Sequence, residues 1–376
     1  MEKKYQICNR CVMDITDPDI QFDDNGICNH CRQYDELVKR YVFDGEQGKE
    51  KLKHIIDKIK KTGTGKEYDC IIGVSGGVDS TYVAYKVKEF GLRPLAVHLD
   101  NGWNSELAVK NIELFLKKLD IDLYTYVIDW EEFKDLQLSF LYASTPDSEI
   151  PSDHAINAIL YQIAEVNKIK YIVFGCNIRT ESHLPKAWSQ GHLDWKYIKN
   201  IQKQYGHIPL QTFPHISYFT YQKYLITCKT VNILNYLDYS KKDAITILEN
   251  ELGWKYYGGK HYESIYTRFY QGYILPKKFG YDKRRTHLSS LICSGEITRS
   301  EALEELNNEP YPLELQEQDK EYVIKKLGIT KDEFERIMNL PKKTYYDYPH
   351  DWMLHPSIQR LIFSSYNVIS GRRINI

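Results

Sequence analysis

The sequence lacks an excess of charge of one sign, and it lacks any long apolar run. Among its 376 residues, 50 Lys and Arg stand against 51 Asp and Glu, which leaves a formal net charge of −1. A chain so balanced has no overall field to attract nucleic acid or an anionic membrane. No stretch approaches the ~18 apolar residues of a membrane span, and Met1–Tyr5 lacks the apolar core of a signal peptide. We therefore expect a cytoplasmic protein with no nucleic-acid and no membrane partner.

Internal repeats and low-complexity tracts are absent as well. Hydrophobic residues make up 42% of the chain and charged residues 27%, as in ordinary soluble globular proteins. The length is sufficient for two or three domains around a large core.

Cysteine is scarce, but half of the eight cysteines fall in two closely spaced pairs near the N-terminus. Cys8 pairs with Cys11 and Cys28 with Cys31, each with two residues between. Such a turn directs two thiolates at one ion, and two turns complete a tetrahedral zinc site. In a reducing compartment, disulfides are a poor alternative. Four thiolates leave no open position, so we expect a structural zinc ion; His30, inside the second pair, is an alternative ligand.

The middle of the chain alternates apolar strands with amphipathic helices. This pattern predicts a parallel, doubly wound sheet, an α/β fold. The expected strands are 68–74, 94–99, 122–128, 170–175 and 231–235. The expected helices between them are 80–90, 105–119 and 154–168. Ligands of such sheets bind beyond the carboxyl ends of the strands, where the strand order reverses.

The motif Ser75-Gly76-Gly77-Val78-Asp79-Ser80 follows the first of these strands and opens a helix. Backbone N–H groups, two hydroxyls and the positive end of a helix dipole then converge on one point, which suits pyrophosphate. The motif is not a Walker A loop, because the Gly-Lys-Ser/Thr ending is missing. It resembles the PP-loop of ATP pyrophosphatases, which cut ATP between its α and β phosphates. That resemblance implies Mg²⁺ and ATP as cofactors, with Ser75 and Asp79 in the catalytic set; a turn that binds no ligand is the alternative.

Three further loops should reach the same cleft. After the second strand, the backbone of Val97, His98 and Leu99 is expected to read adenine, with Asp100 on a ribose hydroxyl or a metal ion. The sequence Asp-Asn-Gly at this point is also an ordinary turn.

After the fourth strand, Gly175 permits close approach to phosphates. Asn177 and Glu181 are candidate catalytic residues. Arg179 is a candidate for the leaving pyrophosphate and Glu181 for Mg²⁺, although the two side chains are equally suited to pair with each other.

The helix before the fourth strand begins near Asp153 and His154, which we take as candidate substrate residues. An Asp at a helix start also serves as a cap whatever the function. Beyond residue 240, basic residues are interleaved with tyrosines, as expected of a wall that binds an anionic, ring-containing substrate. A solvated helix face is the alternative. The candidates here are Lys278 for catalysis and, for substrate binding, His261, Arg268, Lys277 and Arg284.

Taken together, these blocks resemble the N-acetyl-sugar amidotransferases of bacterial surface-glycan pathways. The resemblance is carried by Cys8–Asp14, Ser75–Ser80, Val97–Asn104, Asp153–Ile156, Tyr273–Gly280 and His287–Cys293. It implies adenylation of the acetamido oxygen of a nucleotide-linked uronic acid or a nonulosonic acid. Ammonia then replaces AMP and forms an acetamidino group.

On this basis we divide the chain into four segments. They are a zinc-binding unit with four cysteine ligands (1–43), a helical linker (44–66), a PP-loop ATP-pyrophosphatase domain (67–240) and a helical substrate-binding domain (241–376).

The chain contains no recognisable glutaminase. Position 2 is glutamate where an N-terminal nucleophile would need cysteine, and no Gly-x-Cys-x-Gly elbow occurs. The resemblance implies separate glutaminase and cyclase-like subunits as the source of ammonia, with free ammonia as the fallback.

Two other functions remain open. Some tRNA thiolases join zinc knuckles to a PP-loop, but they need reactive cysteines, often at the start of the helix before the fourth strand. Here that place reads Ser152-Asp153-His154-Ala155. The other alternative is a non-catalytic subunit that binds zinc and nucleotide.

Overall fold

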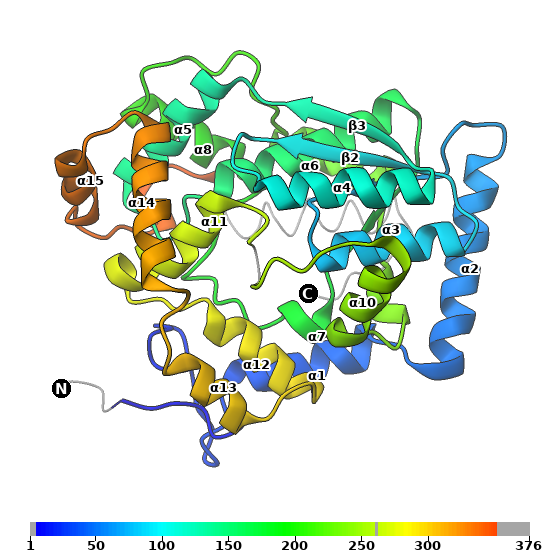
Figure 1. The fold of residues 1–376 in the computed structure, drawn as a ribbon, viewed down its shortest axis with the longest axis horizontal. Coiled ribbons are helices and arrows are strands. Elements are labelled where there is room, and N and C mark those ends of the chain that lie inside the picture. Colours follow the sequence, from blue (N-terminus) through cyan, green and yellow to red (C-terminus); the bar gives the residue numbers. More distant parts are fainter. Residues whose placement is uncertain (1–4, 260–261, 352–376) are drawn as a thin grey trace.

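The computed structural model describes residues 5–259 and 262–351. Its centre is a five-stranded sheet in the order β3-β2-β1-β4-β5, and every neighbouring pair of strands is parallel. Figure 1 shows β2 and β3 side by side at one edge of this sheet. The strands are β1 (Cys70–Gly73), β2 (Pro94–Asp100), β3 (Asp122–Val127), β4 (Tyr171–Phe174) and β5 (Lys229–Asn232). The expected doubly wound parallel sheet is confirmed. The chain starts at the central strand, builds outward to β3 and then returns to the other side of β1, so the strand order reverses between β1 and β4.

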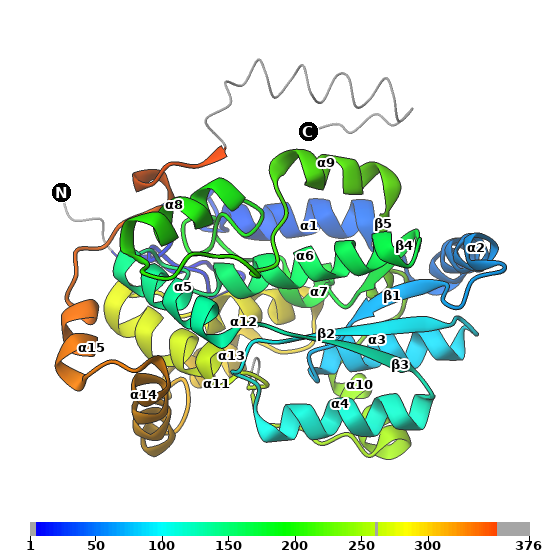
Figure 2. The ribbon, with the colours of Figure 1, turned by 90° about the horizontal axis from the view of Figure 1, so that it is seen from above.

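Helices cover both faces of the sheet, because successive side chains of a strand point to opposite faces. Ile71 of β1 packs with Ile159 and Leu160 in one core cluster. The next residue, Ile72, packs with Val83 and Phe115 in another. Figure 2 shows α6 on one side of the sheet and α4 and α10 on the other. The covering helices are α3 (Val78–Glu89), α4 (Glu106–Leu119), α6 (Ile150–Val166) and α10 (Lys241–Ile247).

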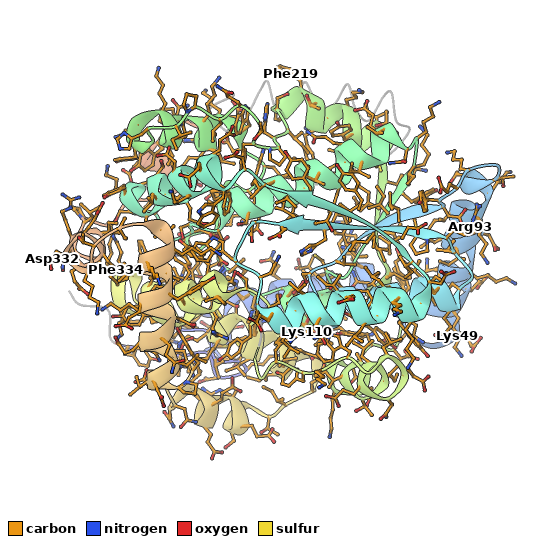
Figure 3. All side chains as sticks on the ribbon, turned by 45° about the horizontal axis from the view of Figure 1, so that its top comes forward. Lys49, Arg93, Lys110, Phe219, Asp332 and Phe334 are labelled. Atoms are coloured by element: carbon orange, nitrogen blue, oxygen red, sulfur yellow. The ribbon has the colours of Figure 1, made fainter. Side chains whose placement is uncertain are left out.

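The connections around β3, β4 and β5 differ from the expectation. β5 begins two residues early and gives way to a 3₁₀ turn, η1 (Ile233–Tyr236), where a longer strand was predicted. The helix before β4 begins four residues earlier than expected, at Ile150. Helices not predicted from the sequence follow β3 and β4: α5 (Trp130–Ala143), α7 (Ile178–Glu181), α8 (Trp195–Tyr205) and α9 (Tyr218–Thr227). Phe219 of α9 is 79% exposed and projects from the surface (Figure 3).

The N-terminal unit is held by isolated antiparallel bridges, Ile7 with Asp14 and Phe22 with Cys28. It continues into α1 (Asn29–Tyr41), which contacts α7 and a helix of the C-terminal region, α12 (Arg284–Ser294). Figure 1 shows α1 beside α12 and α13 (Arg299–Leu306), far from the edge strand β3. Helix α2 (Gly45–Gly63) then leads to the sheet. The first and last thirds of the chain are therefore packed together.

The C-terminal region is helical, and after β5 the described residues contain no further sheet strand. Two of its helices are partly π-helical: α10 continues into η2 (Leu248–Leu252), and α11 into η3 (Tyr270–Phe279). The other elements are α11 (Ile265–Phe269), α12 (Arg284–Ser294), α13 (Arg299–Leu306), α14 (Leu313–Leu327), α15 (Lys331–Met338) and η4 (Tyr345–Asp347). Phe334 of α15 is fully buried against this region, whereas Asp332 lies at its outer edge (Figure 3).

Among the helices described, none has both the length and the apolar character to cross a membrane.

Candidate active site

A cleft of about 470 Å³ opens at the carboxyl ends of β1, β2 and β4, where the strand order reverses. The C-terminal region closes it from the other side through Tyr257, Thr267 and Lys283. The predicted site residues that line this cleft are Ser75, Gly77, Val78, Asp79, Ser80, Val97, His98, Leu99, Asp153, Gly175 and Glu181.

The motif Ser75–Ser80 forms a nest at the start of α3. Gly76 has φ +81°, a left-handed conformation that suits glycine and turns the chain sharply between β1 and α3. The Ser75 hydroxyl accepts from the Gly77 amide at 3.3 Å, and the Ser80 hydroxyl donates to the Gly77 carbonyl at 3.1 Å. Gly77 is the N-cap of α3 and has no side chain of its own, and the next amide, that of Val78, donates to the Tyr257 hydroxyl at 3.3 Å. The positive end of the helix dipole favours an anion at this point.

The two glycines next to the nest are required by close backbone contacts. A Cβ on Gly76 would lie 2.7 Å from the Ala108 carbonyl oxygen of α4. A Cβ on Gly175 would lie 3.0 Å from the Asp79 carbonyl carbon. Gly175 therefore lets the loop after β4 lie directly against the nest, so that both loops line one cleft.

Asp79 lies in the cleft and accepts a hydrogen bond from the Tyr239 hydroxyl. Burial, together with the Asp79 carboxylate, raises the pKa of Tyr239, so the phenol keeps its proton and remains a donor. Tyr239 was not predicted from the sequence, because only the tertiary fold brings it beside the nest.

The His98 side chain links the ends of β1 and β2 through hydrogen bonds. Its Nδ1 donates to the Val74 carbonyl at 2.8 Å, which leaves Nε2 to accept from the Asn104 side-chain amide at 3.0 Å. Asp100 accepts from the Gly102 amide at 2.9 Å, in the ordinary turn that was the alternative for this loop. Asp100 is not among the lining residues of the cleft, whereas Asn101 is.

Of the three polar candidates after β4, only Glu181 lines the cleft. Asn177 is buried and caps α7, where it accepts from the Thr180 amide at 3.0 Å. Arg179 pairs with Asp44 at the start of α2 rather than with Glu181. The structure therefore gives Asn177 and Arg179 roles in holding the loop.

A cluster of charged side chains faces the nest across the cleft, and sequence reasoning found only one of its acids. The His192 Nε2 lies 3.5 Å from a carboxylate oxygen of Asp147 and 3.4 Å from one of Asp153. The Lys283 Nζ lies 3.6 Å from Glu149. The sequence did hold a signal for this cluster: Asp147 and Glu149 lie within one turn of the start of α6, close to the predicted residue Asp153.

Burial and neighbouring charges shift the pKa values of Asp153 and His192 in this cluster. Burial raises the pKa of Asp153 to about 6, although 48% of its side chain stays accessible from the cleft. Burial alone lowers the pKa of His192, but Asp147 and Asp153 outweigh it and raise the value to about 9. At neutral pH the cluster therefore holds a cationic imidazole beside a carboxyl group whose pKa is raised to about 6. Asp153 is not the helix cap; Glu149 occupies that position.

His154, a predicted substrate residue, is fully buried behind the cleft. Its Nδ1 donates to the His192 carbonyl at 2.8 Å, and its Nε2 accepts from the Ile216 amide at 3.1 Å. Burial lowers its pKa to about 4, so it stays neutral. His154 fixes the backbone of His192 and does not face a substrate.

The predicted arginines of the C-terminal region also lie outside the cleft lining. Arg268 forms a two-pronged pair with Asp319, at 2.8 and 2.7 Å. Arg284 pairs with Asp282 at 2.7 Å. Both are committed to links within this region, whereas Lys241 and Lys283 line the cleft, with Lys283 beside Glu149.

The structure does not bring the predicted Lys277 and Lys278 to the cleft either. The Lys277 Nζ lies 3.8 Å from the centre of the Tyr273 ring. Lys278 is buried and donates to the Ile337 carbonyl, and burial lowers its pKa to about 8. His261, the remaining candidate, lies outside the described residues.

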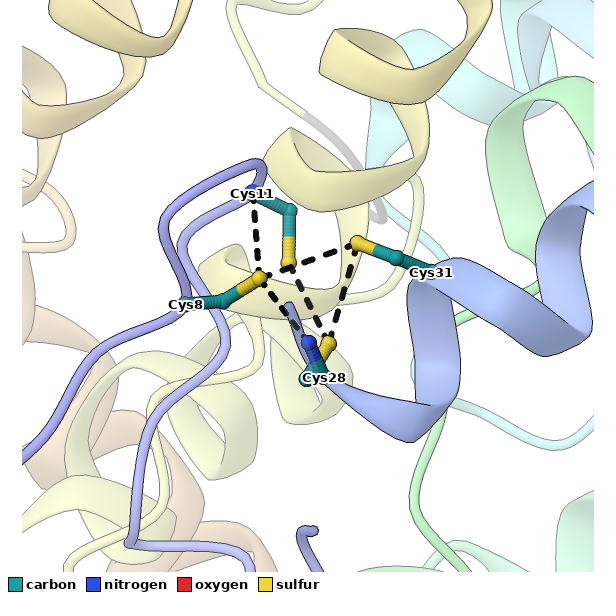
Figure 4. Close-up of side chains that lie close together, drawn as sticks. All are labelled: Cys8, Cys11, Cys28 and Cys31. Carbon is teal, nitrogen blue, oxygen red and sulfur yellow. Dashed lines mark hydrogen bonds between the residues drawn. The ribbon is translucent and has the colours of Figure 1, made fainter. Parts of the chain in front are cut away.

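The two cysteine pairs converge on one point (Figure 4), with all four side chains buried. The Sγ atoms of Cys8 and Cys31 lie 3.8 Å apart, and those of Cys11 and Cys28 and of Cys28 and Cys31 lie 3.7 Å apart. Tetrahedral zinc with Zn–S bonds near 2.3 Å requires sulfur separations of about 3.8 Å. The donor set therefore fits a closed structural zinc site.

The surroundings of the cysteines support the same geometry. Amides of Arg10 and Cys28 donate to the Cys8 sulfur at 3.4 and 3.3 Å, as expected for thiolates. The alternative ligand His30 instead bonds Asp17 at 2.6 Å. Arg299 of α13 donates to the Cys8 carbonyl at 2.9 Å, which joins this unit to the C-terminal helices.

Residues 263–359 match the family described as LPS biosynthesis protein WbpG-like, C-terminal domain. The matched segment includes α11 to α15 and contributes Lys283, Thr267 and Gln271 to the cleft. This match confirms the expected resemblance to the enzymes of bacterial surface-glycan synthesis at the level of lipopolysaccharide biosynthesis.

Other similarities are more distant. A tRNA(Ile)-lysidine synthase of Chlamydia pneumoniae is 26% identical over 159 residues, 35% of this chain and 50% of that protein; the chain thus spans about half the length of this curated relative. The NH3-dependent NAD synthetase from Campylobacter jejuni subsp. jejuni NCTC 11168 in complex with the nitrate ion aligns at 13% identity with a TM-score of 0.32, over 75% of this chain and 96% of that one. The NMN synthetase from Francisella tularensis aligns at 15% identity with a TM-score of 0.30, over 58% and 100%. Neither alignment is close enough to transfer a function.

Proposed function

We propose that this chain, which carries a C-terminal domain of the WbpG-like lipopolysaccharide biosynthesis type, is an ATP-dependent amidotransferase that acts on an acetamido sugar. The observation that carries the proposal is the pairing, in one cleft, of the Ser75–Ser80 nest at the start of α3 with the charged cluster of Asp153, His192 and Lys283. The nest suits a leaving pyrophosphate. The cluster supplies an acid and a base that line the same cleft as the nest.

In the first step the oxygen of the N-acetyl group attacks the α-phosphorus of ATP. An O–P bond forms, the bond to the β-phosphate breaks, and pyrophosphate leaves into the nest of Ser75–Ser80. Activation is needed because an amide oxygen is a very poor leaving group, whereas AMP is a good one. Asp79 and Glu181 are the cleft carboxylates suited to hold Mg²⁺, which neutralises charge on the phosphates when bound. Here the chain acts chiefly by positioning and charge stabilisation.

In the second step ammonia adds to the activated carbon and AMP departs, which leaves an amidine. The attacking nitrogen must lose a proton as its bond to carbon forms. Asp153 is suited to accept it, since a base with a pKa of about 6 is largely ionised at neutral pH yet still takes up protons. The cationic His192 beside it compensates the charge of the departing phosphate.

Ammonia is proposed to come from separate glutaminase and cyclase-like subunits, because the sequence has no glutaminase signature. The purified chain should use ammonium salts and fail with glutamine. Efficient use of glutamine by the lone chain would contradict this part of the proposal.

The test is a product assay on the full chain with ATP, Mg²⁺, ammonium and a panel of acetamido sugars, both nucleotide-linked uronic acids and nonulosonic acids. We expect AMP and pyrophosphate in equal amounts, and mass spectrometry should show nitrogen in place of the acetamido oxygen. Asp79→Asn should abolish turnover. Asp332→Asn, on the outer edge of α15, is the matched control and should leave it unchanged (Figure 3). Formation of ADP in place of AMP would overturn the mechanism.

A tRNA-modifying function is the second candidate, favoured by the partial match to the tRNA(Ile)-lysidine synthase. It predicts salt-sensitive co-purification with tRNA and AMP formation that depends on tRNA and not on a sugar. A non-catalytic, nucleotide-binding role would be excluded by sugar-dependent exchange between ATP and pyrophosphate.

A further inference from the structure

A fifth cysteine and a histidine lie directly beside the zinc-binding cysteines. Cys293 comes from α12, and its sulfur lies 3.8 Å from that of Cys31. His183 comes from the segment after α7, and its Nε2 lies 3.6 Å from the Cys293 sulfur. The ligand atoms of Cys31, His183 and Cys293 all lie within 4.8 Å of one another. Cys31 and His183 are buried and Cys293 is half-buried.

The hydrogen bonds of His183 determine which of its ring nitrogens is available. The Ser290 hydroxyl donates to the Thr286 carbonyl at 3.1 Å, so towards His183 it acts as an acceptor. The His183 Nδ1, 2.9 Å away, therefore carries the proton. The lone pair of Nε2 then points at Cys293. A histidine held by an Nδ1–H bond with Nε2 presented to a thiol is the arrangement found in metal sites.

The distances agree with a second tetrahedral ion. Zn–S bonds near 2.3 Å and Zn–N bonds near 2.0–2.1 Å require separations of about 3.8 Å between two sulfurs and about 3.6 Å between sulfur and nitrogen. The corresponding distances here are 3.8 Å for Cys31 with Cys293 and 3.6 Å for Cys293 with His183. Cys31 also lies 3.8 Å from Cys8 and 3.7 Å from Cys28, so its sulfur is a vertex of both ligand sets.

We propose that Cys31, His183 and Cys293 form a second site for a zinc-type divalent cation, adjacent to the four-cysteine site and bridged to it by the Cys31 thiolate. Charge favours the second ion. Four thiolates around one dication leave two negative charges in a buried place, whereas five thiolates around two dications leave one. Three protein ligands leave a fourth position for water or another small ligand.

The second site would join three parts of the chain that are far apart in sequence. Cys31 lies in α1, Cys293 in α12, and His183 only two residues beyond Glu181, which lines the cleft. Binding of the second ion would thus fix the segment that carries Glu181 between the N-terminal unit and the C-terminal helices. The inference does not depend on the reaction proposed above.

The test is a titration of the full chain, stripped of metal under reducing, anaerobic conditions, with Co²⁺. The visible bands of Co²⁺ distinguish a four-thiolate site from one with nitrogen and oxygen ligands, because the latter impose a stronger ligand field. We expect two equivalents to bind, with a second set of bands at higher energy. Cys293→Ala and His183→Gln should each bind one equivalent and keep the four-thiolate spectrum, which also shows that they fold. Cys228→Ala, a buried cysteine outside both ligand sets, is the matched control and should bind two.

A second measurement uses the unaltered chain alone. Two Co²⁺ ions that share the Cys31 thiolate couple magnetically, so the electron paramagnetic resonance signal per cobalt should fall as the second equivalent binds. Saturation of the unaltered chain at one equivalent would overturn the proposal. So would the binding of two equivalents by both single variants, or two uncoupled ions.

Discussion

Replacing Gly76 by alanine should damage both the stability of the nest and its binding of nucleotide. Gly76 has φ +81°, and its backbone is fixed from both sides. A Cβ would meet the Ala108 carbonyl oxygen at 2.7 Å, while the Gly76 carbonyl accepts from the Trp254 indole at 2.9 Å. The loop therefore has little room to move away from the new methyl group.

The expected cost has two parts that a matched variant separates. A left-handed backbone costs alanine about 1–2 kcal/mol relative to glycine. Overpacking against a fixed neighbour adds about 1–3 kcal/mol. Gly280 has φ +79°, and its Cβ would have nothing within 4 Å, so Gly280→Ala carries only the first cost. We expect Gly76→Ala to lower the free energy of unfolding by about 2–5 kcal/mol and Gly280→Ala by about 1–2 kcal/mol.

Urea unfolding of both variants measures the difference, and calorimetry with a non-hydrolysable ATP analogue measures binding. Loss of one amide contact to a charged phosphate costs about 1.5–3 kcal/mol, so Gly76→Ala should weaken binding at least about tenfold. Gly280→Ala should bind normally. The reasoning is refuted if the two variants unfold at the same urea concentration and bind the analogue as the unaltered chain does.

The site makes three further predictions. His192→Gln should lower the free energy of unfolding by at most about 3 kcal/mol below pH 6.5. The difference should vanish as the pH rises through about 9, because the pKa of His192 is raised to about 9 in the folded state. Urea unfolding at pH 6 and pH 9.5 checks this, and an equal effect at both pH values would contradict it. Cys11→Ala should abolish zinc binding at the four-cysteine site and destabilise the packing of α1 on α12. Metal analysis measures the first effect and near-ultraviolet circular dichroism the second. Retention of a tightly bound ion would count against that site. Lys278→Met should reduce stability but leave AMP formation unchanged, since Lys278 bonds the Ile337 carbonyl away from the cleft; a loss of turnover in a folded variant would return Lys278 to the catalytic set.

The elements predicted correctly are those whose signals are local. The glycine turn between β1 and α3 follows from glycine at 76 and 77 between an apolar strand and a helix, and the buried cluster of four cysteines follows from two pairs at fixed spacing. The sheet follows from the alternation of apolar and amphipathic segments. In each case the signal is made of short units, such as a Cys-x-x-Cys pair or a single strand, whose residues lie within a few positions of one another.

The candidates that the structure moved away from the cleft show the limit of this reasoning. Arg268 and Lys278 have the right charge, but the first is neutralised by Asp319 and the second is buried against Ile337. Neither partner is near in sequence. Conversely, His192 and Tyr239 carried no pattern of their own. The fold places His192 in the cleft lining and Tyr239 against the cleft residue Asp79.

By itself, the sequence determined the five parallel strands, the glycine turn after β1 and the pairing of the four clustered cysteines, because backbone preferences and short spacings are properties of neighbouring residues. Only the tertiary structure decided which charges face one another: Lys283 with Glu149, His192 with Asp147 and Asp153, and Cys293 with Cys31. The reason is physical. The charge state and the chemistry of an ionisable group depend on burial and on partners a few ångströms away, and those partners come from segments that only folding brings together.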